Sequence, residues 1–328
     1  MADADQKHQA YHHEHGNSHT HGHEHGGSHF QQSPRPNDEA FTEANRTHWN
    51  KSAASYTAEQ WQKDFLNKIT AFIQQHIDWI GVDFVDPSTV FETKAGLETD
   101  SHAAKQVRVL DYACGPGSVT HALGARATEY IGIDLSENMV QAYNLRFAVP
   151  APASQINSAA APSSRQGPDS GPVLPDLEPE PEPEPEPELE PESFNAHAVV
   201  GNLLVPSDPA PSNLSSPEFY NFDIVVVGLG FHHFSDIPLA TRRLVERLRP
   251  GGVFLIIDFV THAMENPDAN PAVNTVAHHG FSEQDLRRYF EEAGLSEFGI
   301  VRMGEEVLLR GTMKREPFMA RGSKIRIG

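Results

Sequence analysis

The chain has 328 residues, of which 38% are hydrophobic, and a formal net charge of -20 at pH 7. An acidic chain without a basic patch excludes the electrostatic footprint of a nucleic-acid-binding protein and attraction to an anionic membrane surface. The only cysteine, Cys114, excludes an intrachain disulfide framework and is typical of a reducing compartment. We see no secretory leader and no run of about 18 apolar residues, so we expect a cytoplasmic protein, with the nucleus left open.

A histidine-rich segment opens the chain. Residues 1–36 mix histidine with glycine, serine and glutamate, a composition that predicts a disordered tail. Neutral imidazole is a good ligand for zinc, nickel and copper, so the tail is a candidate for loose metal binding. The histidines that would take part are His12, His13, His15, His19, His21, His23 and His25. The alternative is a disordered tail that binds metal only incidentally, and we expect no metal site in the folded domain.

Residues 37–104 are predicted to form a helical cover ahead of the main domain. Apolar residues recur there at spacings of three and four, which marks one face of a helix over about 58–79. These residues are Trp61, Phe65, Ile69, Phe72, Ile73 and Ile77. Gly81 is suited to ending this helix.

The segment 107–117 has the pattern of a nucleotide-binding corner. A short apolar strand stops at Asp111, and Gly115 and Gly117 follow before a predicted helix over 118–126. Glycine lets the backbone approach a ligand closely, and a helix N-terminus offers unpaired N–H groups.

A second short strand, 130–134, also ends in an acid, Asp134. Ser136 is suited to capping the helix that follows. The residues expected to face inward from that helix are Met139, Val140 and Tyr143. Residues 150–193 then form a Pro- and Glu-rich segment that cannot bury a core, and we expect a disordered insertion in a surface loop. An interaction segment is the alternative.

Strands and helices alternate again after this insertion. The further strands are predicted at 197–200, 222–227 and 253–259, and the helices at 237–248 and 282–294. Two late strands, 298–303 and 306–314, would pair as an antiparallel hairpin at one edge, and 316–328 would be a C-terminal tail.

This alternation predicts an α/β domain over 105–315, interrupted by the insertion at 150–193. Its fold would be a Rossmann-like, doubly wound, mostly parallel sheet of seven strands with an antiparallel C-terminal edge hairpin and an N-terminal helical cover. In such a sheet, ligands bind at the carboxyl ends of the strands.

The residues of the corner favour a cationic ligand without phosphate. A dinucleotide fingerprint has a third glycine where this chain has Thr120. Asp111, four residues before Gly115, would repel a pyrophosphate and attract an ammonium group. Asp134 lies at a strand tip, where an acid meets a ribose diol. A ligand with an ammonium group, a ribose and an adenine fits best, and S-adenosylmethionine is that ligand.

The chain resembles class I S-adenosylmethionine-dependent methyltransferases, and in particular their small-molecule, ubiquinone/menaquinone-biosynthesis-like branch. Four segments carry the resemblance, L-D-Y-A-C-G-P-G, I-G-I-D-L-S-E-N-M-V, F-D-I-V-V-V-G-L-G-F-H-H-F and L-R-P-G-G-V-F-L-I-I-D. Their order and spacing match over about 105–315, apart from the insertion. Together they are specific for the cofactor and only weakly specific for the acceptor.

The resemblance also implies which residues would hold the cofactor. They are Asp111, Gly115 and Gly117 for the methionine part, Asp134 for the ribose hydroxyls, Leu135 and Met139 beside the adenine, Asn202 and Leu203 at its amino edge, Gly228 at the fourth strand, and Tyr56 near the cofactor carboxylate. The family often has an aspartate where this chain has Asn202, although an amide oxygen also accepts hydrogen bonds.

Methyl transfer from a sulfonium is a direct displacement, so the protein mainly aligns the acceptor and excludes water. A general base helps only if the acceptor must lose a proton. His233 is the first candidate because it follows the fourth strand, with His232 beside it. His278 and His279 are further candidates, and polar lining or structural hydrogen bonding is the alternative for all four.

The sequence excludes some classes of methyl acceptor but does not identify the acceptor. The fourth strand lacks an Asn/Asp-Pro-Pro-aromatic motif, which argues against amino methylation of adenine or glutamine, and one cysteine argues against arsenic methylation. A small organic acceptor remains, such as a phenol, quinol, amine or carboxylate, methylated on oxygen, nitrogen or carbon. The alternatives are a non-catalytic S-adenosylmethionine-binding protein and a metal-handling protein that uses the histidine tail.

Overall fold

The structure, a computed structural model, describes residues 38–56, 58–88, 105–148, 194–263 and 274–326. All of these residues belong to a single unit, Asn37–Gly328. The predicted histidine-rich tail and the predicted insertion at 150–193 lie outside the described residues.

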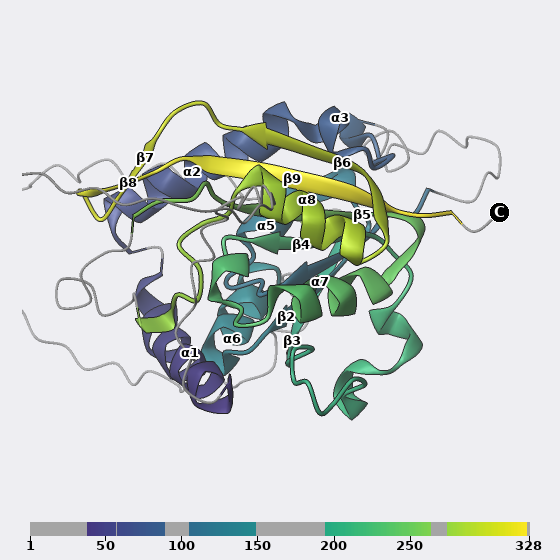
Figure 1. The fold of residues 1–328 in the computed structure, drawn as a ribbon, viewed down its shortest axis with the longest axis horizontal. Coiled ribbons are helices and arrows are strands. Elements are labelled where there is room, and N and C mark those ends of the chain that lie inside the picture. Colours follow the sequence, from purple (N-terminus) through teal and green to yellow (C-terminus); the bar gives the residue numbers. More distant parts are fainter. Residues whose placement is uncertain (1–37, 57, 89–104, 149–193, 264–273, 327–328) are drawn as a thin grey trace, which may run out of the picture. The chain divides into compact units, whose positions relative to one another are not determined.

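Seven strands form one sheet in the order β3-β2-β1-β4-β5-β9-β6 (Figure 1). They are β1 (Arg108–Tyr112), β2 (Glu129–Asp134), β3 (Asn195–Val200), β4 (Phe222–Gly228), β5 (Leu248–Phe259), β6 (Leu295–Arg302) and β9 (Pro317–Lys324). Strands β1 to β5 pair in parallel, whereas β9 pairs antiparallel with both β5 and β6. The predicted doubly wound, mostly parallel sheet with an antiparallel C-terminal edge is therefore confirmed.

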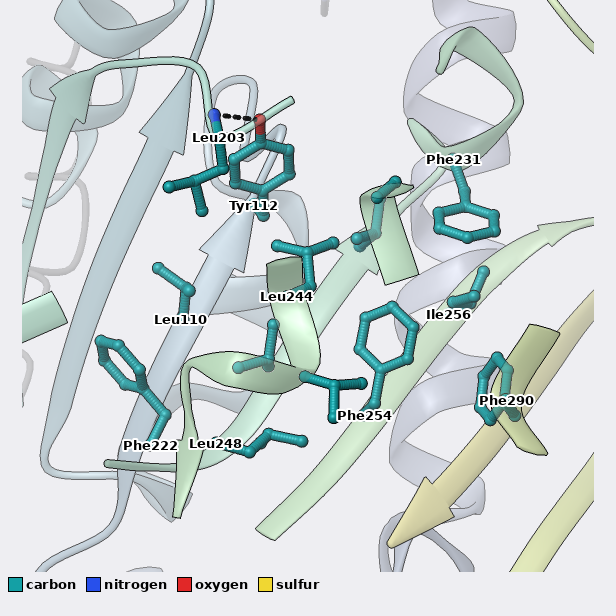
Figure 2. Close-up of a cluster of buried hydrophobic side chains, with 14 of the residues drawn as sticks. Leu110, Tyr112, Leu203, Phe222, Phe231, Leu244, Leu248, Phe254, Ile256 and Phe290 are labelled. Atoms are coloured by element: carbon teal, nitrogen blue, oxygen red, sulfur yellow. Dashed lines mark hydrogen bonds between the residues drawn. The ribbon is translucent and has the colours of Figure 1, made fainter. Parts of the chain in front are cut away.

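Helices cover both faces of this sheet. They are α1 (Asp38–Ser52), α2 (Gln60–Gln75), α3 (Ile77–Ile80), α5 (Ser118–Leu123), α6 (Glu137–Arg146), α7 (Ile237–Glu246) and α8 (Glu283–Glu292). Because successive strand residues point to opposite faces, Val109 and Leu110 of β1 enter different apolar clusters. The cluster of Leu110 includes Leu244 of α7 and Phe290 of α8 (Figure 2), and the cluster of Val109 includes residues of α2 and α5.

Local signals in the sequence predict several element ends correctly. The Oγ atom of Ser136 accepts a hydrogen bond from the Met139 N–H at 3.1 Å, so Ser136 caps α6. Ser282 caps α8 in the same way. After α3, Gly81 has a left-handed φ of 84°, which ends the helix.

The single helix predicted over 58–79 is wrong in one respect, because the chain breaks at His76 into α2 and α3. The His76 ring nitrogen Nδ1 lies 2.8 Å from the Phe72 carbonyl oxygen, where the backbone N–H of a continuous helix would bond. That N–H instead donates to Ile73, one residue closer. Competition between the side chain and the backbone therefore accounts for the break.

The C-terminal strands differ from the prediction. The predicted strand 306–314 forms no part of the main sheet, because β7 (Val307–Leu309) and β8 (Met313–Arg315) pair with each other as a separate hairpin. The expected C-terminal tail contains β9, which lies between β5 and β6. The sequence of β9, P-F-M-A-R-G-S-K, is not strongly apolar and therefore gives no local sign of a strand. The segment is a strand because β5 and β6 pair with it on both sides.

The strand order places the site. The sheet runs β3-β2-β1 in one direction and then continues with β4 on the other side of β1. In open parallel sheets, a crevice forms at this change of direction, outside the carboxyl ends of the strands. Residues that follow β1, β2 and β4 therefore meet at one edge of the sheet.

Candidate functional site

A main cavity of about 610 Å³ lies where the ends of β1, β2 and β4 meet. The predicted site residues that line it are Tyr56, Gly115, Asp134, Leu135, Met139, Asn202, Gly228 and His233. A small hollow of about 30 Å³ shares Tyr56, Gly115 and Gly228 with the main cavity and adds Asp111. Gly117, Leu203 and His232 line neither space. The structure thus brings together most, but not all, of the residues predicted to hold a cofactor.

Asp134, the last residue of β2, is held in one orientation by the backbone. Its Oδ2 accepts a hydrogen bond from the Gly115 N–H at 2.8 Å, and its Oδ1 accepts one from the Ser136 N–H at 2.8 Å. Burial raises the pKa of this carboxyl, whereas these backbone hydrogen bonds act in the opposite direction. Each carboxylate oxygen can accept more than one hydrogen bond. Asp134 therefore links the turn after β1 to the start of α6 while lining the cavity.

The two glycines of the turn have different surroundings, although both have a left-handed backbone, with φ of 51° at Gly115 and 81° at Gly117. A Cβ added to Gly115 would meet nothing within 4 Å, because this residue borders both the cavity and the hollow. A Cβ added to Gly117 would lie 2.3 Å from the ring of Phe147 and 2.9 Å from that of Tyr143. Gly115 therefore borders ligand space, and Gly117 allows the turn to pack against α6.

Asp111 is only 1% exposed and lies in the wall of the small hollow. The Thr120 hydroxyl donates a hydrogen bond to its Oδ2 at 2.9 Å. Burial raises the pKa of Asp111 to about 7, although the hydrogen bonds with Thr120 lower it. A cation in the hollow would favour the ionised carboxylate, so this position suits an ammonium group.

The loop after β3 brings Asn202 to the main cavity and turns Leu203 away from it. The Asn202 Oδ1 accepts a hydrogen bond from the Leu204 N–H at 2.8 Å. The Leu203 N–H donates to the Tyr112 hydroxyl at 3.0 Å (Figure 2), and the Leu203 side chain is fully buried in the core. Leu204, rather than Leu203, therefore lines the cavity beside Asn202.

Two residues without a sequence signal, Ala113 and Leu229, are strained at the site. Their φ angles of 56° and 61° are left-handed, although neither residue is glycine. Both line the main cavity and the small hollow. A left-handed backbone costs roughly 1–2 kcal/mol for such residues, and backbone strain of this kind clusters at functional sites.

Tyr56 follows the short 3₁₀ turn Ala53–Ser55 and lines both spaces. Burial raises the pKa of its hydroxyl to about 12, so this group stays protonated and able to donate a hydrogen bond. Leu135 and Met139 line the main cavity beside Asp134, and the Met139 side chain is 2% exposed. These placements agree with the predicted positions of all three residues, while their roles stay predictions.

One face of α1 also borders the main cavity. The residues of α1 that line it are Glu39, Phe41, Thr42, Asn45 and Trp49, which we call the helical wall. Spacings of three and four place them on the same side of the helix. The sequence carries little sign of this wall, because the polar residues within it interrupt the apolar periodicity that marks a packed helix. In contrast, we call Ala113, Gly115, Asp134, Asn202 and Gly228 the strand-end wall.

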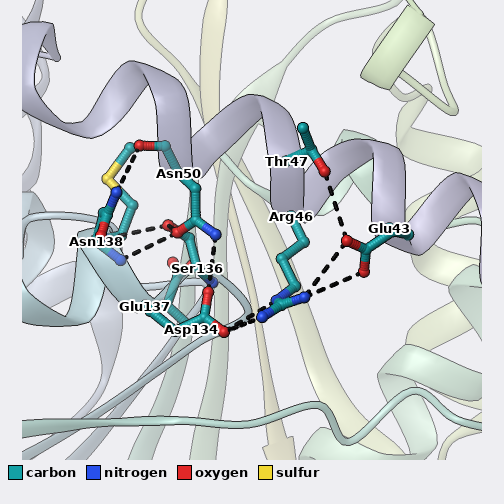
Figure 3. Close-up of polar contacts among 9 residues, drawn as sticks. Glu43, Arg46, Thr47, Asn50, Asp134, Ser136, Glu137 and Asn138 are labelled. Atoms are coloured by element: carbon teal, nitrogen blue, oxygen red, sulfur yellow. Dashed lines mark hydrogen bonds and ion pairs between the residues drawn. The ribbon is translucent and has the colours of Figure 1, made fainter.

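A set of polar contacts attaches α1 to α6 beside Asp134 (Figure 3). Arg46 donates to Glu137 Oε1 from Nε at 3.0 Å, and Asn50 Nδ2 donates to Glu137 Oε2 at 2.8 Å. The Ser136 hydroxyl donates to Asn50 Oδ1 at 2.7 Å. Hydrogen bonds from Arg46 and Asn50 lower the pKa of Glu137 to about 2. We call these four residues the α1 latch, and it joins the helical wall to the loop that carries Asp134.

His233 lines the main cavity, whereas His232 does not. His233 Nδ1 lies 2.7 Å from the Thr275 carbonyl oxygen, which requires a proton on Nδ1 and leaves Nε2 as the acceptor. Burial, with His232 nearby, lowers the pKa of His233 well below its usual value. His232 Nδ1 instead lies 2.8 Å from Oδ1 of the buried Asp258. Of the two, His233 has the geometry of a neutral acceptor at the cavity.

The other two histidine candidates, His278 and His279, line neither the main cavity nor the small hollow. None of the described helices combines the length and the hydrophobicity that a membrane span requires. The described part of the chain contains no group of three or more His, Cys, Asp or Glu side chains arranged to hold a metal ion.

Comparison with known proteins gives one family. The model of the methyltransferase-domain family matches residues 50–296. An uncharacterised methyltransferase of Schizosaccharomyces pombe is 25% identical over 198 residues, which make up 59% of this chain and 55% of the relative. This chain thus spans about half the length of that curated relative.

Solved structures with a similar fold include two methyltransferases. The magnesium protoporphyrin IX methyltransferase of Synechocystis, solved with bound S-adenosylmethionine, has 13% identity and a TM-score of 0.46 over 89% of this chain and 100% of its own. The phosphoethanolamine N-methyltransferase 2 of Haemonchus contortus has 13% identity and a TM-score of 0.42 over 77% of this chain and 57% of its own. Because the family model covers well over half of the sequence, this chain belongs to the methyltransferase-domain family, as its resemblance to class I S-adenosylmethionine-dependent methyltransferases predicts.

Proposed function

We propose that this protein transfers the methyl group of S-adenosylmethionine to a small-molecule acceptor by direct displacement. The observation that carries the proposal is the position of Asp134. It is buried at the end of β2, bonded to the Gly115 N–H, and part of the wall of the main cavity. A carboxylate at this point of a doubly wound sheet is placed to accept hydrogen bonds from a ribose diol.

The residues around Asp134 fit the remaining parts of the same cofactor. Asp111 in the small hollow offers a carboxyl group to an ammonium group, and the nearby Tyr56 hydroxyl offers a donor to a carboxylate. Leu135 and Met139 offer apolar contact to an adenine ring. Asn202 in the same cavity is the candidate for its amino edge. The bound cofactor supplies an activated methyl group on a positively charged sulfur.

The side chains of the cavity would then align the acceptor and exclude water, which is the main requirement of a direct displacement. An acceptor that carries a proton on its reacting atom must lose it, and His233 is our candidate for taking it. Its Nδ1 is occupied by the Thr275 carbonyl group, so Nε2 is the basic atom. The lowered pKa of His233 keeps this base form present at neutral pH.

The reacting atom, oxygen, nitrogen or carbon, is left open by this proposal, and the ubiquinone/menaquinone-like branch stays a prediction. We also propose a cytoplasmic or nuclear location. A non-catalytic S-adenosylmethionine-binding protein would bind the cofactor in the same way but would transfer no methyl group. A combined measurement of binding and methyl transfer therefore separates this alternative from our proposal.

Isothermal titration with S-adenosylmethionine, paired with transfer of a labelled methyl group to cell-extract metabolites, tests this function. We expect binding and a labelled small molecule in the parent protein, and weaker binding with less labelled product in Asp134→Ala. Binding without any labelled product would favour the non-catalytic alternative. Binding that is equally tight in Asp134→Ala would contradict the assigned site.

A further inference from the structure

We propose that the methyl acceptor is an aromatic molecule without a negative charge, and that its hydroxyl or amine group donates a hydrogen bond to Asn45 or His233. This inference rests on the proposed function, because it assigns the part of the main cavity that the cofactor would leave for the acceptor. It also narrows the range of acceptors to exclude carboxylates and phosphates.

The charge of the cavity is the first argument. Two carboxylates, Glu39 and Asp134, line it, and a third, Asp111, lies in the adjoining hollow. Among the described residues that line these spaces there is no lysine and no arginine. An anionic acceptor would therefore lose its hydration without gaining an ionic partner among these side chains, and only the sulfonium of the bound cofactor would offer it a positive charge. A neutral or cationic acceptor meets no such cost.

Asn45 gives the second argument, because it is a buried polar side chain with an unused acceptor. Asn45 is 6% exposed, and its Nδ2 donates to the Phe41 carbonyl oxygen at 3.2 Å. Its Oδ1 has no hydrogen-bond donor among the described residues. A buried oxygen that lacks a hydrogen bond has lost its hydration without compensation, and such groups are uncommon in native proteins. A hydrogen-bond donor on the acceptor would supply the missing hydrogen bond.

His233 gives the third argument, because it presents a second acceptor from another element. The Thr275 carbonyl oxygen fixes the proton on Nδ1 and thereby leaves the lone pair on Nε2. The ring meets the Trp49 ring edge to face, with centroids 5.2 Å apart. Trp49 lies one helical turn beyond Asn45 on α1 and therefore lies between Asn45 and His233. A ligand group that can donate a hydrogen bond suits these two acceptor atoms better than a group that can only accept one.

Aromatic side chains give the fourth argument, which concerns the shape of the acceptor. Those that line the main cavity are Phe41, Trp49, Tyr56, Tyr112 and Phe234. The Trp49 ring lies edge-on to Tyr56, and the Tyr112 ring edge-on to Phe234, with centroids 6.1 and 5.7 Å apart. These side-chain rings pack against one another and present aromatic surfaces to the cavity. Contacts between aromatic rings favour an aromatic ligand over an aliphatic one.

The test uses the full chain and four fragment sets that carry the same rings: phenols, anilines, benzoates and phenyl phosphates. Binding is measured by ligand-observed NMR in the presence of saturating S-adenosylhomocysteine. We expect the phenols and anilines to bind and the two anionic sets to fail. In Asn45→Leu and in His233→Phe, we expect binding of the phenols to weaken at least fivefold. Asn45→Asp keeps an acceptor oxygen but cannot donate to the Phe41 carbonyl group, so it should weaken phenol binding less than Asn45→Leu does.

The controls separate a ligand role from a structural one. Glu43→Gln, on an exposed part of α1, should leave fragment binding unchanged. Without ligand, Asn45→Leu should melt close to the parent protein, because the change removes an unsatisfied oxygen together with the one hydrogen bond from Nδ2 to the Phe41 carbonyl oxygen. A lower melting temperature together with unchanged phenol binding would show a purely structural asparagine and overturn the inference.

Three other results would also overturn it: anionic fragments that bind as well as the neutral ones, phenol binding that neither variant weakens, or no binding by any phenol or aniline. Calorimetry with S-adenosylhomocysteine on the same samples separates a failure of the acceptor inference from a failure of the proposed function. Cofactor binding with contradictory fragment results rejects only the acceptor class, whereas failure to bind the cofactor product rejects the proposed function itself.

Discussion

The two walls of the main cavity are built in different ways. The strand-end wall follows parallel strands whose backbones are paired, and Asp134 in it is bonded to backbone N–H groups on both oxygens. The helical wall is attached through the α1 latch, in which Arg46 and Glu137 keep about two fifths of their side-chain surface exposed. Exposed ion pairs of this kind contribute little to stability. The sheet therefore holds the strand-end wall, to which we assign the cofactor, more firmly than the latch holds the helical wall, to which we assign the acceptor.

The largest expected effect comes from His233→Asn, at a residue that belongs to neither wall and whose ring lies against Trp49 of the helical wall. This change removes the proposed proton acceptor but none of the strand-end wall, so we expect turnover to fall by about 10²–10⁴-fold with unchanged cofactor affinity. Steady-state kinetics and calorimetry would measure the two quantities. His197→Asn, on the edge strand β3, is the matched control. A fall in both quantities together would assign His233 to the cofactor instead.

His233 also sets an expectation for pH. Because its pKa is lowered in the folded protein, the neutral base form is lost only as the pH falls below the usual value of 6.5. We therefore expect turnover to show no titration of this base between about pH 6.5 and pH 8. A base titration near pH 7 in the kcat profile would contradict a desolvated His233.

The second largest effect concerns Asp111. Its raised pKa of about 7 means that the buried carboxyl must lose a proton before it can pair with an ammonium group. Cofactor affinity should therefore rise by up to about tenfold per pH unit between pH 5 and pH 7. Calorimetry across this range would measure the rise, and Asp111→Asn should flatten it. An equally steep profile in that variant would place the titrating group elsewhere.

The same raised pKa has a consequence for stability. Between the ordinary pKa of 3.8 and about 7, Asp111 is protonated in the folded chain and ionised in the unfolded chain. The unfolded state thus binds fewer protons, so this residue lowers the free energy of unfolding as the pH rises through that window. Chemical denaturation of the parent protein and Asp111→Asn at pH 4.5 and pH 7 would check the sign.

Asp134→Ala should have the next largest effect, on the strand-end wall alone. Loss of charge-assisted hydrogen bonds to the ribose would weaken cofactor binding by about 1.5–3 kcal/mol, or roughly ten- to 150-fold. Asp285→Ala, in α8, is the control carboxylate away from the cavity. Equal affinity in parent and Asp134→Ala by calorimetry would remove Asp134 from the site.

The two glycines of the turn offer a smaller and more selective test. Gly117→Ala adds a clash with Phe147 to an unfavourable left-handed backbone, so we expect it to lower the free energy of unfolding by more than the roughly 1–2 kcal/mol of the backbone term. Gly115→Ala has the same unfavourable left-handed backbone but no clash, and its added methyl group would enter the space proposed for the cofactor. Cofactor binding should suffer more in Gly115→Ala, and stability more in Gly117→Ala. The reverse order, measured by calorimetry and urea denaturation, would contradict the placement of the turn.

The smallest expected effect comes from the α1 latch. Asn50→Ala removes hydrogen bonds to Ser136 and Glu137 and should cost about 1 kcal/mol of stability. If the helical wall serves the acceptor, KM for the acceptor should rise several-fold with a smaller change for the cofactor. Thr47→Ala, on the exposed side of α1, controls for helix propensity. A larger change for the cofactor would mean that the latch mainly supports Asp134.

Much of the strand-end wall follows from local sequence. A strand that ends in an acid, a glycine turn and a Ser-capped helix are each decided within a few residues, and Asp134 and Ser136 occupy the predicted positions. The main sheet also follows from alternating elements. Its C-terminal edge does not, because β9 is a strand only through pairing with β5 and β6.

The sequence by itself determined the parallel sheet, the position of the cofactor turn and the class of methyl donor, because short-range patterns of burial, capping and charge encode them. Only the tertiary structure decided which face of α1 meets the cavity, that Gly117 packs against α6, and that Asn45 keeps an unused acceptor. Arg46 and Glu137 are 91 residues apart, and such a contact forms only when the sheet brings α6 beside α1. The helical wall, to which we assign the acceptor, is therefore a product of long-range packing, which no local pattern records.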